Sequence, residues 1–432
     1  METFKRIKLT LAVALIFVFA INATFAIDSY NFKKDKDIDE NENYQSFQGR
    51  VVDEESSKPL VFATVGIEGT NIATVTNTDG KFLIKVPNDK VAGNLKIAYM
   101  GYESKTIAIS DLKNHGSVNT IKLKMVSVKL TEINVFPNNP RLIIDKVLEN
   151  RRFNYSFEPQ LMKAFYRETI KRRRAYVGLS EAVVEVYKQS YGSYKNDQVK
   201  LFKGRKSEDV KKMDTLLFKL QGGPISTLML DIVKDPYLVL DNDVLDKYEY
   251  TYKSITRVDG NLNYVIEFKQ NPYVLTPLFY GSIYIDVESF AITSISFNLN
   301  TQDKDQVSSM FIKKKPFGVS VYPTSANYLV NYREKDGKWF FSYSRGEVNF
   351  DVKWKKRLFK TNFSTMIEMA ITDWDKATEK QFQSSDRLRM NVVMSDAVTG
   401  FTDKDFWGEY NTIEPDQSIE SAIKKIKKNI GK

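Results

Sequence analysis

The sequence lacks cysteine and contains a single histidine, His115, among its 432 residues. Without a thiol the chain can form neither disulfides nor zinc–cysteine sites, and it has no cysteine nucleophile. One imidazole is too few for a histidine-rich zinc site, and a Ser-His-acid triad could use only His115. The surrounding segment, DLKNHGSVN, is polar and rich in turn residues, which favours a solvated loop. No glycine-rich phosphate loop and no G-x-S-x-G motif occurs, so we expect no cofactor and no metal site.

Long apolar runs are also scarce, and the clearest one stands at the N-terminus. Three cations precede the segment LTLAVALIFVFAINATFA, which ends in small residues at Ala26. This layout is typical of a secretory signal peptide, and the run is near the lower length limit of a membrane span. We therefore predict a signal peptide over 1–26, with a membrane anchor as the alternative. A charged, disordered leader is expected over 27–45.

Charge of one sign does not dominate the chain. The 64 Lys and Arg residues are balanced by 54 Asp and Glu residues, which leaves a formal net charge of +10. A mixed surface of this kind is unlike the footprint of a nucleic-acid-binding protein, and export argues against such a partner as well. We expect an exported protein in the periplasm, associated with the outer membrane, or at the cell surface.

Residues 46–125 consist of short segments that alternate apolar and polar residues, separated by turn signals. Several short strands at such spacing predict a β-sandwich of the seven-stranded type. Asp79-Gly80 predicts a hairpin turn, because glycine tolerates the positive φ that such turns require.

The motifs of this region resemble those of the carboxypeptidase-regulatory-like domain. They are Gly49-Arg50-Val51-Val52-Asp53, Pro59-Leu60, Ala63 with Val65, Gly69-Thr70, Thr76 with Asp79-Gly80, Phe82 with Ile84, and Met100-Gly101-Tyr102. The resemblance implies a transthyretin-like sandwich of the kind found at the N-terminus of exported Bacteroidetes proteins. It covers only an accessory domain, and a zinc peptidase would need histidine ligands that this chain lacks. We therefore expect a protein that is not an enzyme.

After a linker and helix over 126–160, the segment 161–375 predicts a larger antiparallel α+β domain. Its strands are long and one face is aromatic, so helices expected within 207–234 should cover that face. We predict an open or half-barrel sheet. The region loosely resembles outer-membrane lipoprotein-sorting half-barrels through Gly281-Ser282-Ile283-Tyr284-Ile285-Asp286, Ala291-Ile292, Ile295 and Phe297.

Two basic segments are candidates for surface or partner contacts. The first is Lys171, Arg172, Arg173 and Arg174, which we interpret as the exposed tip of a hairpin between strands. The second belongs to the tail over 376–432, where isoleucines share one face of a predicted helix with a basic face formed by Lys424, Lys425, Lys427 and Lys428. Such a helix can dock onto its own domain or lie on an anionic membrane surface.

Acidic side chains offer one route to catalysis. If residues 164–191 form a hairpin, Glu168 and Glu181 would face each other. Separately, Asp241, Asp243 and Asp246 lie close to one another in the segment DNDVLD. Two carboxylates at a suitable separation can hydrolyse a glycosidic bond. The competing interpretation is that the glutamates pair with neighbouring arginines across the strands.

Three functional hypotheses follow. The leading one is an exported, non-enzymatic envelope protein with a binding or assembly role, whose partner is an envelope protein, an outer-membrane receptor, a lipid or a membrane surface. The second is a lipid or lipoprotein carrier with a pocket beneath 224–233, and the third is a carboxylate-dependent hydrolase. An unfilled apolar cavity would favour the carrier, a fully packed core the interaction module, and converging carboxylates the enzyme.

Overall fold

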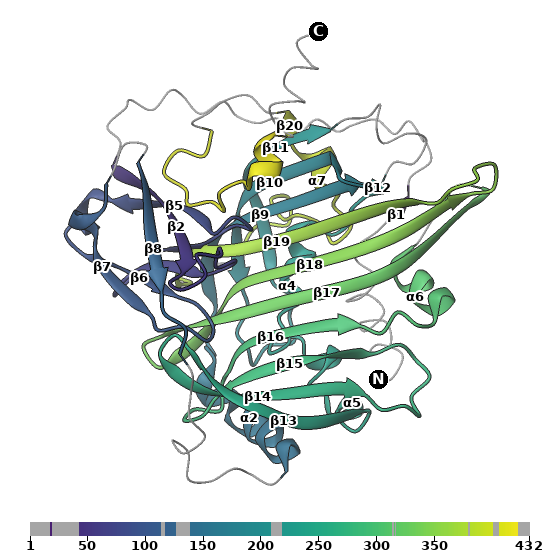
Figure 1. The fold of residues 1–432 in the computed structure, drawn as a ribbon, viewed down its shortest axis with the longest axis horizontal. Coiled ribbons are helices and arrows are strands. Elements are labelled where there is room, and N and C mark those ends of the chain that lie inside the picture. The colour runs from purple at the N-terminus through teal and green to yellow at the C-terminus, as the bar shows by residue number, and fades with distance from the viewer. Residues whose placement is uncertain are drawn as a thin grey trace.

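The computed structural model describes residues 18–19, 43–113, 117–126, 139–208, 218–312, 315, 317–378, 381–400 and 406–421. It confirms a mainly β chain in which a small two-sheet sandwich precedes a large open antiparallel sheet with few helices (Figure 1). His115, most of the predicted signal peptide and leader, and the four tail lysines lie outside the described residues. Within the described ranges, no helix has the length and apolar character that a membrane crossing requires.

The sandwich is built from seven strands in two sheets. One sheet has the order β5-β2-β8, formed by β2 (Tyr44–Asp53), β5 (Lys81–Pro87) and β8 (Val118–Leu123). The other has the order β4-β3-β6-β7, formed by β3 (Thr64–Ile67), β4 (Ala73–Val75), β6 (Asn94–Ala98) and β7 (Lys105–Ala108). Short 3₁₀ turns follow at η1 (Asn88–Lys90) and η2 (Ile109–Asp111). Inward-facing residues of both sheets, such as Val51, Val65, Ile84 and Ile97, share one buried core.

The Asp79-Gly80 turn is present, but it does not close a hairpin. It carries the chain from β4 in one sheet to β5 in the other, and Gly80 has φ +73°. A Cβ at Gly80 would stand 2.6 Å from the carbonyl oxygen of Val51, so glycine is required by space as well as by backbone conformation. The turn signal was therefore right and the predicted pairing of its flanking strands was wrong.

Ten antiparallel strands and one short parallel strand make up the large sheet. Their order across the sheet is β13-β14-β15-β16-β17-β18-β19-β9-β10-β11-β20. In chain order they are β9 (Gln160–Arg172), β10 (Ala175–Lys188), β11 (Gln198–Glu208), β13 (Tyr248–Val258), β14 (Asn261–Gln270), β15 (Phe279–Asp286), β16 (Ile292–Leu299), β17 (Val319–Lys335), β18 (Lys338–Trp354), β19 (Thr361–Lys376) and β20 (Thr399–Gly400). A separate two-residue pair joins β1 (Val18–Phe19) to β12 (Phe218–Lys219).

The predicted hairpins of this region are confirmed. β13 and β14 meet across Asp259-Gly260, β15 pairs with β16, and β17 and β18 meet across Asp336-Gly337. Residues 176–187 lie in β10, so the strand interpretation was correct there. The pairing of β19 with β9, which are distant in sequence, places β9 and β10 inside the sheet rather than at its edge.

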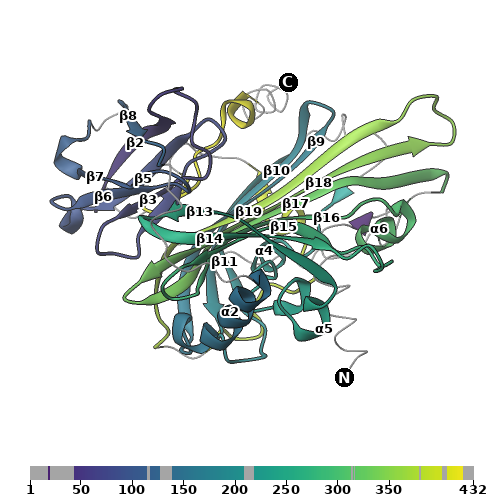
Figure 2. The same cartoon turned by 60° about the horizontal axis from the view of Figure 1, so that its bottom comes forward.

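Both faces of the sheet are covered, as Figure 2 shows from the side. Along β9, Ala164 and Tyr166 belong to the large core beneath the helices, whereas Phe165 packs with Trp407 of the tail and Val75 of the sandwich. Because successive side chains of a strand point to opposite faces, β9 contributes to two cores at once. The sheet therefore joins a helix-covered face to a face covered by the sandwich and tail.

The helical cover differs from the prediction. The helix expected within 126–160 is present as α2 (Pro140–Asn154). It starts at a proline, with the Asn139 side chain accepting from the Arg141 amide, and it buries Ile143, Ile144 and Val147. The prediction of helices within 207–234 is confirmed only in part, because β11 continues to Glu208 and β12 occupies Phe218–Lys219, whereas residues 224–228 are helical. Other short helices are α4 (Pro224–Leu228), η4 (Pro236–Leu238), α5 (Asn242–Leu245), α6 (Lys304–Phe311) and α7 (Met394–Ala397).

Candidate functional site

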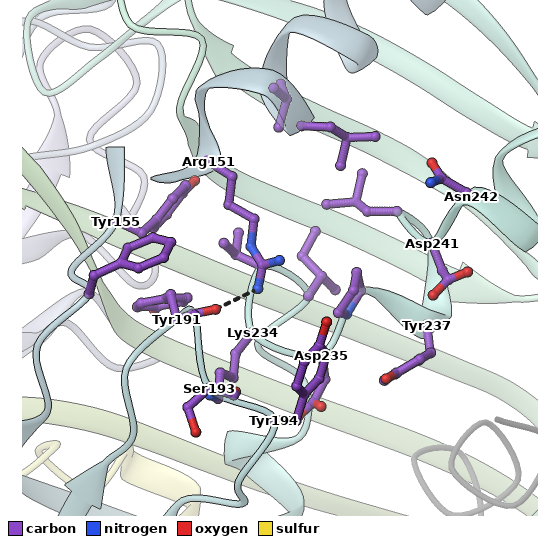
Figure 3. Close-up of a pocket in the computed structure, with 18 of the residues that line it drawn as sticks. Arg151, Tyr155, Tyr191, Ser193, Tyr194, Lys234, Asp235, Tyr237, Asp241 and Asn242 are labelled. Carbon is purple, nitrogen blue, oxygen red and sulfur yellow. Dashed lines mark hydrogen bonds between the residues drawn. The ribbon is translucent and has the colours of Figure 1, made fainter. Parts of the chain in front are cut away.

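A cavity of about 820 Å³ opens between α2, the β10–β11 loop and the segment that follows α4 (Figure 3). Val147, Leu148 and Tyr155 contribute apolar and aromatic surface from the α2 side. Arg151, Lys195, Lys234, Asp235 and Asp241 contribute charge around it. Its volume is within the range of about 300–1,000 Å³ that is usual for small-molecule sites.

A second cavity, of about 830 Å³, adjoins the first. The two cavities share a wall made by the β10–β11 loop and the segment after α4, whose common residues are Tyr194, Lys195, Lys234, Asp235 and Tyr237. Its lining is richer in aliphatic and thioether groups, supplied by Ile225, Leu228, Met229, Leu238, Leu388 and Met390. The cavity therefore lies where the carrier hypothesis placed a pocket, against the 224–233 segment.

The shape of this apolar wall follows from Gly222-Gly223-Pro224. Both glycines have positive φ, +101° and +50°, and a Cβ on Gly223 would approach the Met394 side chain to 2.7 Å. Pro224 then starts α4, whose five residues are all buried. A helix cannot run through such a backbone, so α4 begins at Pro224. The rest of the apolar run ISTLMLDIV continues as tight turns after Leu228.

A buried charge cluster holds the two walls together. The Lys188 side chain, 1% exposed, lies 2.7 Å from a carboxylate oxygen of Asp197 in the β10–β11 loop and 2.7 Å from one of Asp231 after α4. Tyr191 and Tyr332 donate to Asp231 at 3.0 and 2.8 Å. Burial alone would raise the pKa of Asp231, but Lys188 and the two hydroxyls lower it, so the carboxylate is charged at neutral pH.

Two buried donors beside the cavities have no hydrogen-bond partner among the described residues. They are Nε of Arg151, which lines the first cavity, and Nε2 of Gln189, which lines the second. Another nitrogen of Arg151 donates to the carbonyl of Tyr191 at 3.0 Å, which fixes the guanidinium at the cavity edge (Figure 3). Unpartnered buried donors are uncommon in folded proteins, and these two can serve an acceptor on a ligand.

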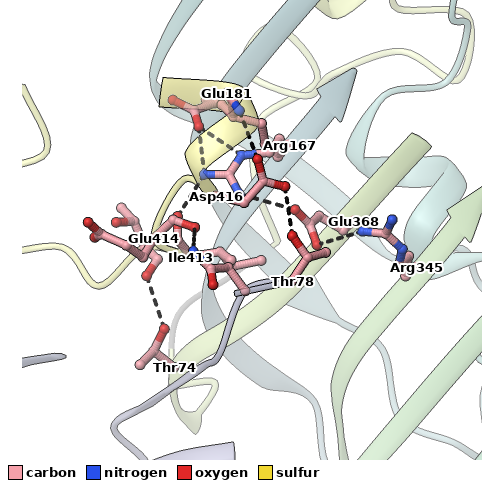
Figure 4. Close-up of polar contacts among 12 residues, drawn as sticks. Thr74, Thr78, Arg167, Glu181, Arg345, Glu368, Ile413, Glu414 and Asp416 are labelled. Carbon is pink, nitrogen blue, oxygen red and sulfur yellow. Dashed lines mark hydrogen bonds and ion pairs between the residues drawn. The ribbon is translucent and has the colours of Figure 1, made fainter. Parts of the chain in front are cut away.

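The opposite face of the sheet carries a ladder of alternating charges across five adjacent strands (Figure 4). In spatial order it runs through Arg345 on β18, Glu368 on β19, Arg167 on β9, Glu181 on β10 and Arg205 on β11. Successive members approach to 3.4, 3.2, 2.7 and 2.8 Å. We call these five residues the charge ladder. Burial would raise the pKa of Glu181, but Arg167 and Arg205 on either side lower it.

The tail crosses the charge ladder and binds the sandwich. Arg167 donates to the carbonyl of Ile413 at 2.7 Å, while Thr74 of the sandwich donates to the carbonyl of Thr412 at 3.0 Å. Thr78 donates to Asp416, which in turn accepts from the Ile419 amide at the start of the last described helical turn, 417–421. The tail therefore ties the sandwich to the sheet at the ladder.

The predicted carboxylate pair does not form. Glu181 lies opposite Arg167, and Glu168 lies opposite Ser180 and accepts from Tyr166 on the other face of the sheet. A register one residue different from the expected one places the two glutamates on opposite faces. The arginine interpretation is correct for Glu181.

The aspartate cluster is also explained by local structure. Asp241 caps α5 by accepting from the Asp243 amide, and Asp246 pairs with Arg141 at 2.9 Å. Within the described ranges, no group of three or more metal-binding side chains is assembled.

The first basic run lies where the sequence predicted it, at the tip of the β9–β10 hairpin. Arg173 and Arg174 are exposed, Arg173 has φ +56°, and Lys171 packs over the Tyr176 ring. This tip is at the opposite end of β10 from the cavities, so the structure does not bring the run to them. The lysines Lys424, Lys425, Lys427 and Lys428 lie outside the described residues.

Sequence reasoning missed Arg151, Lys188 and Asp231. A lysine at the end of an apolar strand and an aspartate inside the apolar run ISTLMLDIV are signals of buried polar groups, because an uncompensated charge is costly in such surroundings. Nothing in the sequence indicates that the two residues, which are far apart along the chain, would pair with each other.

Comparison with known proteins identifies the sandwich. Residues 47–135 match the family model of the CarboxypepD_reg-like domain. This match confirms the resemblance seen in the motifs between Gly49 and Tyr102. No curated protein matches the chain.

Solved structures provide distant neighbours. An outer membrane lipoprotein-sorting protein domain from Vibrio parahaemolyticus is 9% identical, with 56% of this chain and 95% of its own covered and a TM-score of 0.25. A structure of lipid–protein interactions in lipovitellin is 7% identical over 55% of this chain and 27% of its own, with a TM-score of 0.27. A DUF1329 family protein from Desulfovibrio piger is 11% identical over 57% of this chain and 99% of its own, with a TM-score of 0.23.

Proposed function

We propose that this chain is an exported, non-enzymatic binding protein of the bacterial envelope that holds an amphiphile with an apolar chain in the two adjoining cavities. The observation that carries the proposal is an apolar wall placed beside buried donors that have no protein partner within the described part of the chain. The predicted signal peptide supports export, and the match of the sandwich to an accessory domain supports a role in binding.

The second cavity fits the apolar part of such a ligand. Its wall of Leu228, Met229, Leu388 and Met390 offers flexible surface that can adapt to a hydrocarbon chain. Removing a chain from water is favourable by about 25 cal/mol for each Å² of apolar surface buried. An acyl chain gains most of its binding free energy from such a wall.

The first cavity fits the polar end. The guanidinium of Arg151 is held by Tyr191 and has its Nε free of partners among the described residues, and Lys195 and Lys234 lie on the shared wall. Charge-assisted hydrogen bonds from arginine to carboxylate or phosphate oxygens are stronger than neutral ones. We therefore propose that the headgroup carries a carboxylate or phosphate, whose oxygens accept hydrogen bonds from Arg151.

Native mass spectrometry of the protein, purified without detergent from its own envelope, tests this function. We expect a bound mass that is released as lipid on denaturation. A bare protein mass, together with no binding of a fluorescent fatty acid, would remove the carrier role and leave an interaction module.

A charged substitution in the cavity gives a matched comparison. Met390 lines the second cavity and is 38% exposed, so Met390→Glu should fold, and its carboxylate should disfavour a hydrocarbon chain there because burying the charge would cost hydration. We expect the affinity for the fluorescent fatty acid to fall by about tenfold or more, where tenfold corresponds to about 1.4 kcal/mol. Met125→Glu is the control, since Met125 is exposed in the sandwich. Equal affinities for the two variants would contradict the assigned site.

A further inference from the structure

Three turns gather at the end of the sheet opposite the cavities. The β9–β10 turn lies beside the start of β19, because the Arg173 amide donates to the carbonyl of Asn362 at 2.8 Å. The β18–β19 loop lies beside the residues before β17, because the Lys355 amide donates to the carbonyl of Gly318 at 2.8 Å. Figures 1 and 2 show the β17, β18 and β19 strands extending at this end beyond the neighbouring strands.

These turns combine cations with exposed apolar side chains. Leu358 and Phe359 are 85% and 75% exposed, and Phe317 is fully exposed. We call the following residues the basic tip: Arg172, Arg173, Arg174, Phe317, Lys355, Lys356, Arg357, Leu358, Phe359 and Lys360. Asp351 is an acidic side chain that contacts the basic tip, and its carboxylate accepts from Lys360 and Asn362.

We propose that the basic tip docks on an anionic phospholipid surface. Phosphate headgroups would be held by the arginines and lysines of two neighbouring turns, while Leu358, Phe359 and Phe317 enter the boundary between headgroups and acyl chains. Basic residues near an anionic leaflet are attracted to it, and apolar side chains at the tip of a turn reach the interface without an extended contact surface. Long Lys and Arg side chains can keep their charges among the headgroups as the apolar residues enter.

A protein partner is the weaker match to these observations. A protein interface usually needs a broad complementary surface with about 800 Å² from each partner, and its core is depleted of charged residues. The large apolar side chains here stand on separate turn ends, and cations surround them. The docking surface is also separate from the cavities, which lie at the other end of β10, so it stands independently of the proposed ligand.

Flotation with phosphatidylcholine vesicles that either contain or lack phosphatidylglycerol tests the proposal. We expect the protein to bind only the anionic vesicles, and to bind less as salt is added, because salt screens exposed charges. Absence of binding to the anionic vesicles would overturn the proposal. Loss of an envelope protein crosslink in Leu358→Ser/Phe359→Ser, with no vesicle binding by the wild type, would identify the tip as a protein-binding surface instead.

Two pairs of variants locate the surface. Arg174→Glu/Lys356→Glu takes one exposed cation from each turn, and we expect vesicle binding to fall by about tenfold or more. Lys58→Glu/Lys124→Glu makes the same charge change on the sandwich and should bind as the wild type does.

For the apolar residues, Leu358→Ser/Phe359→Ser should reduce vesicle binding, whereas Leu142→Ser/Phe153→Ser on α2 should not. Equal losses within a pair of variants would show that the basic tip is not the docking site. Thermal unfolding of each variant keeps a loss of binding distinct from a loss of fold.

Discussion

The charge ladder and the Lys188 cluster, formed by Lys188, Asp197 and Asp231, lie on opposite faces of the same sheet. They differ in what surrounds them. In the ladder, each side-chain nitrogen of Arg167 has a protein acceptor, namely Glu181, Glu368 and the carbonyl of Ile413. Near the Lys188 cluster, the cavities keep two buried donors without a described partner. The difference indicates that the ladder joins parts of the fold, while the other face retains hydrogen-bonding capacity for a ligand.

The largest effect is expected from removing the centre of the charge ladder. Arg167→Met would leave Glu181 and Glu368 buried without the arginine that pairs with both of them. The free energy of unfolding should fall by about 3–5 kcal/mol. Chemical denaturation measures this value. Arg174→Met changes an exposed arginine on the neighbouring turn and should alter stability by less than about 0.5 kcal/mol. Similar stabilities for the two variants would show that the ladder does not hold the fold together.

A smaller effect is expected from one hydroxyl of the Lys188 cluster. Tyr332→Phe removes a donor to the charged Asp231 and should lower the free energy of unfolding by about 1.5–3 kcal/mol. Tyr328, on the same strand and also buried, has a hydroxyl without a described hydrogen-bond partner. Tyr328→Phe should therefore be neutral or stabilising. If both variants lose stability equally, the hydrogen bond to Asp231 is not the cause.

Local patterns predicted much of the fold. The sandwich followed from its motifs between Gly49 and Tyr102, and the tight turns at Asp259-Gly260 and Asp336-Gly337 fixed two hairpins because short turns leave little freedom of register. The exposed tip at 171–174 followed from the cost of burying four cations.

The parts that failed depend on register and on contacts distant in sequence. A shift of one residue between β9 and β10 sent Glu168 and Glu181 to opposite faces. The cavities depend on Lys188 meeting Asp231 and on Leu388 and Met390 reaching the wall formed by Ile225 and Leu228, which no local pattern specifies. Residues 224–233 form a helix only over 224–228, because burial on several sides makes a strongly apolar run look like a longer helix than it is.

The smallest effect expected concerns the tail where it crosses the charge ladder. Burial, and to a smaller degree Glu420, raises the pKa of Glu414 above its ordinary value of 4.5, although Arg167 acts in the opposite direction. A raised pKa in the folded state means that the contribution of this group is present below pH 4.5 and is lost as the pH rises through the folded pKa. Glu414→Gln should therefore stabilise the protein at pH 7 and make less difference near pH 4.

Urea unfolding at the two pH values measures this difference, with Glu409→Gln as the control because Glu409 is an exposed glutamate of the same tail. The Asn77 side chain bonds the backbone carbonyl of residue 414, so this contact survives the substitution. If Glu414→Gln instead loses stability at pH 7, its carboxylate makes a net favourable ion pair with Arg167. The tail would then be a charged member of the ladder rather than a cover held by backbone and hydroxyl hydrogen bonds.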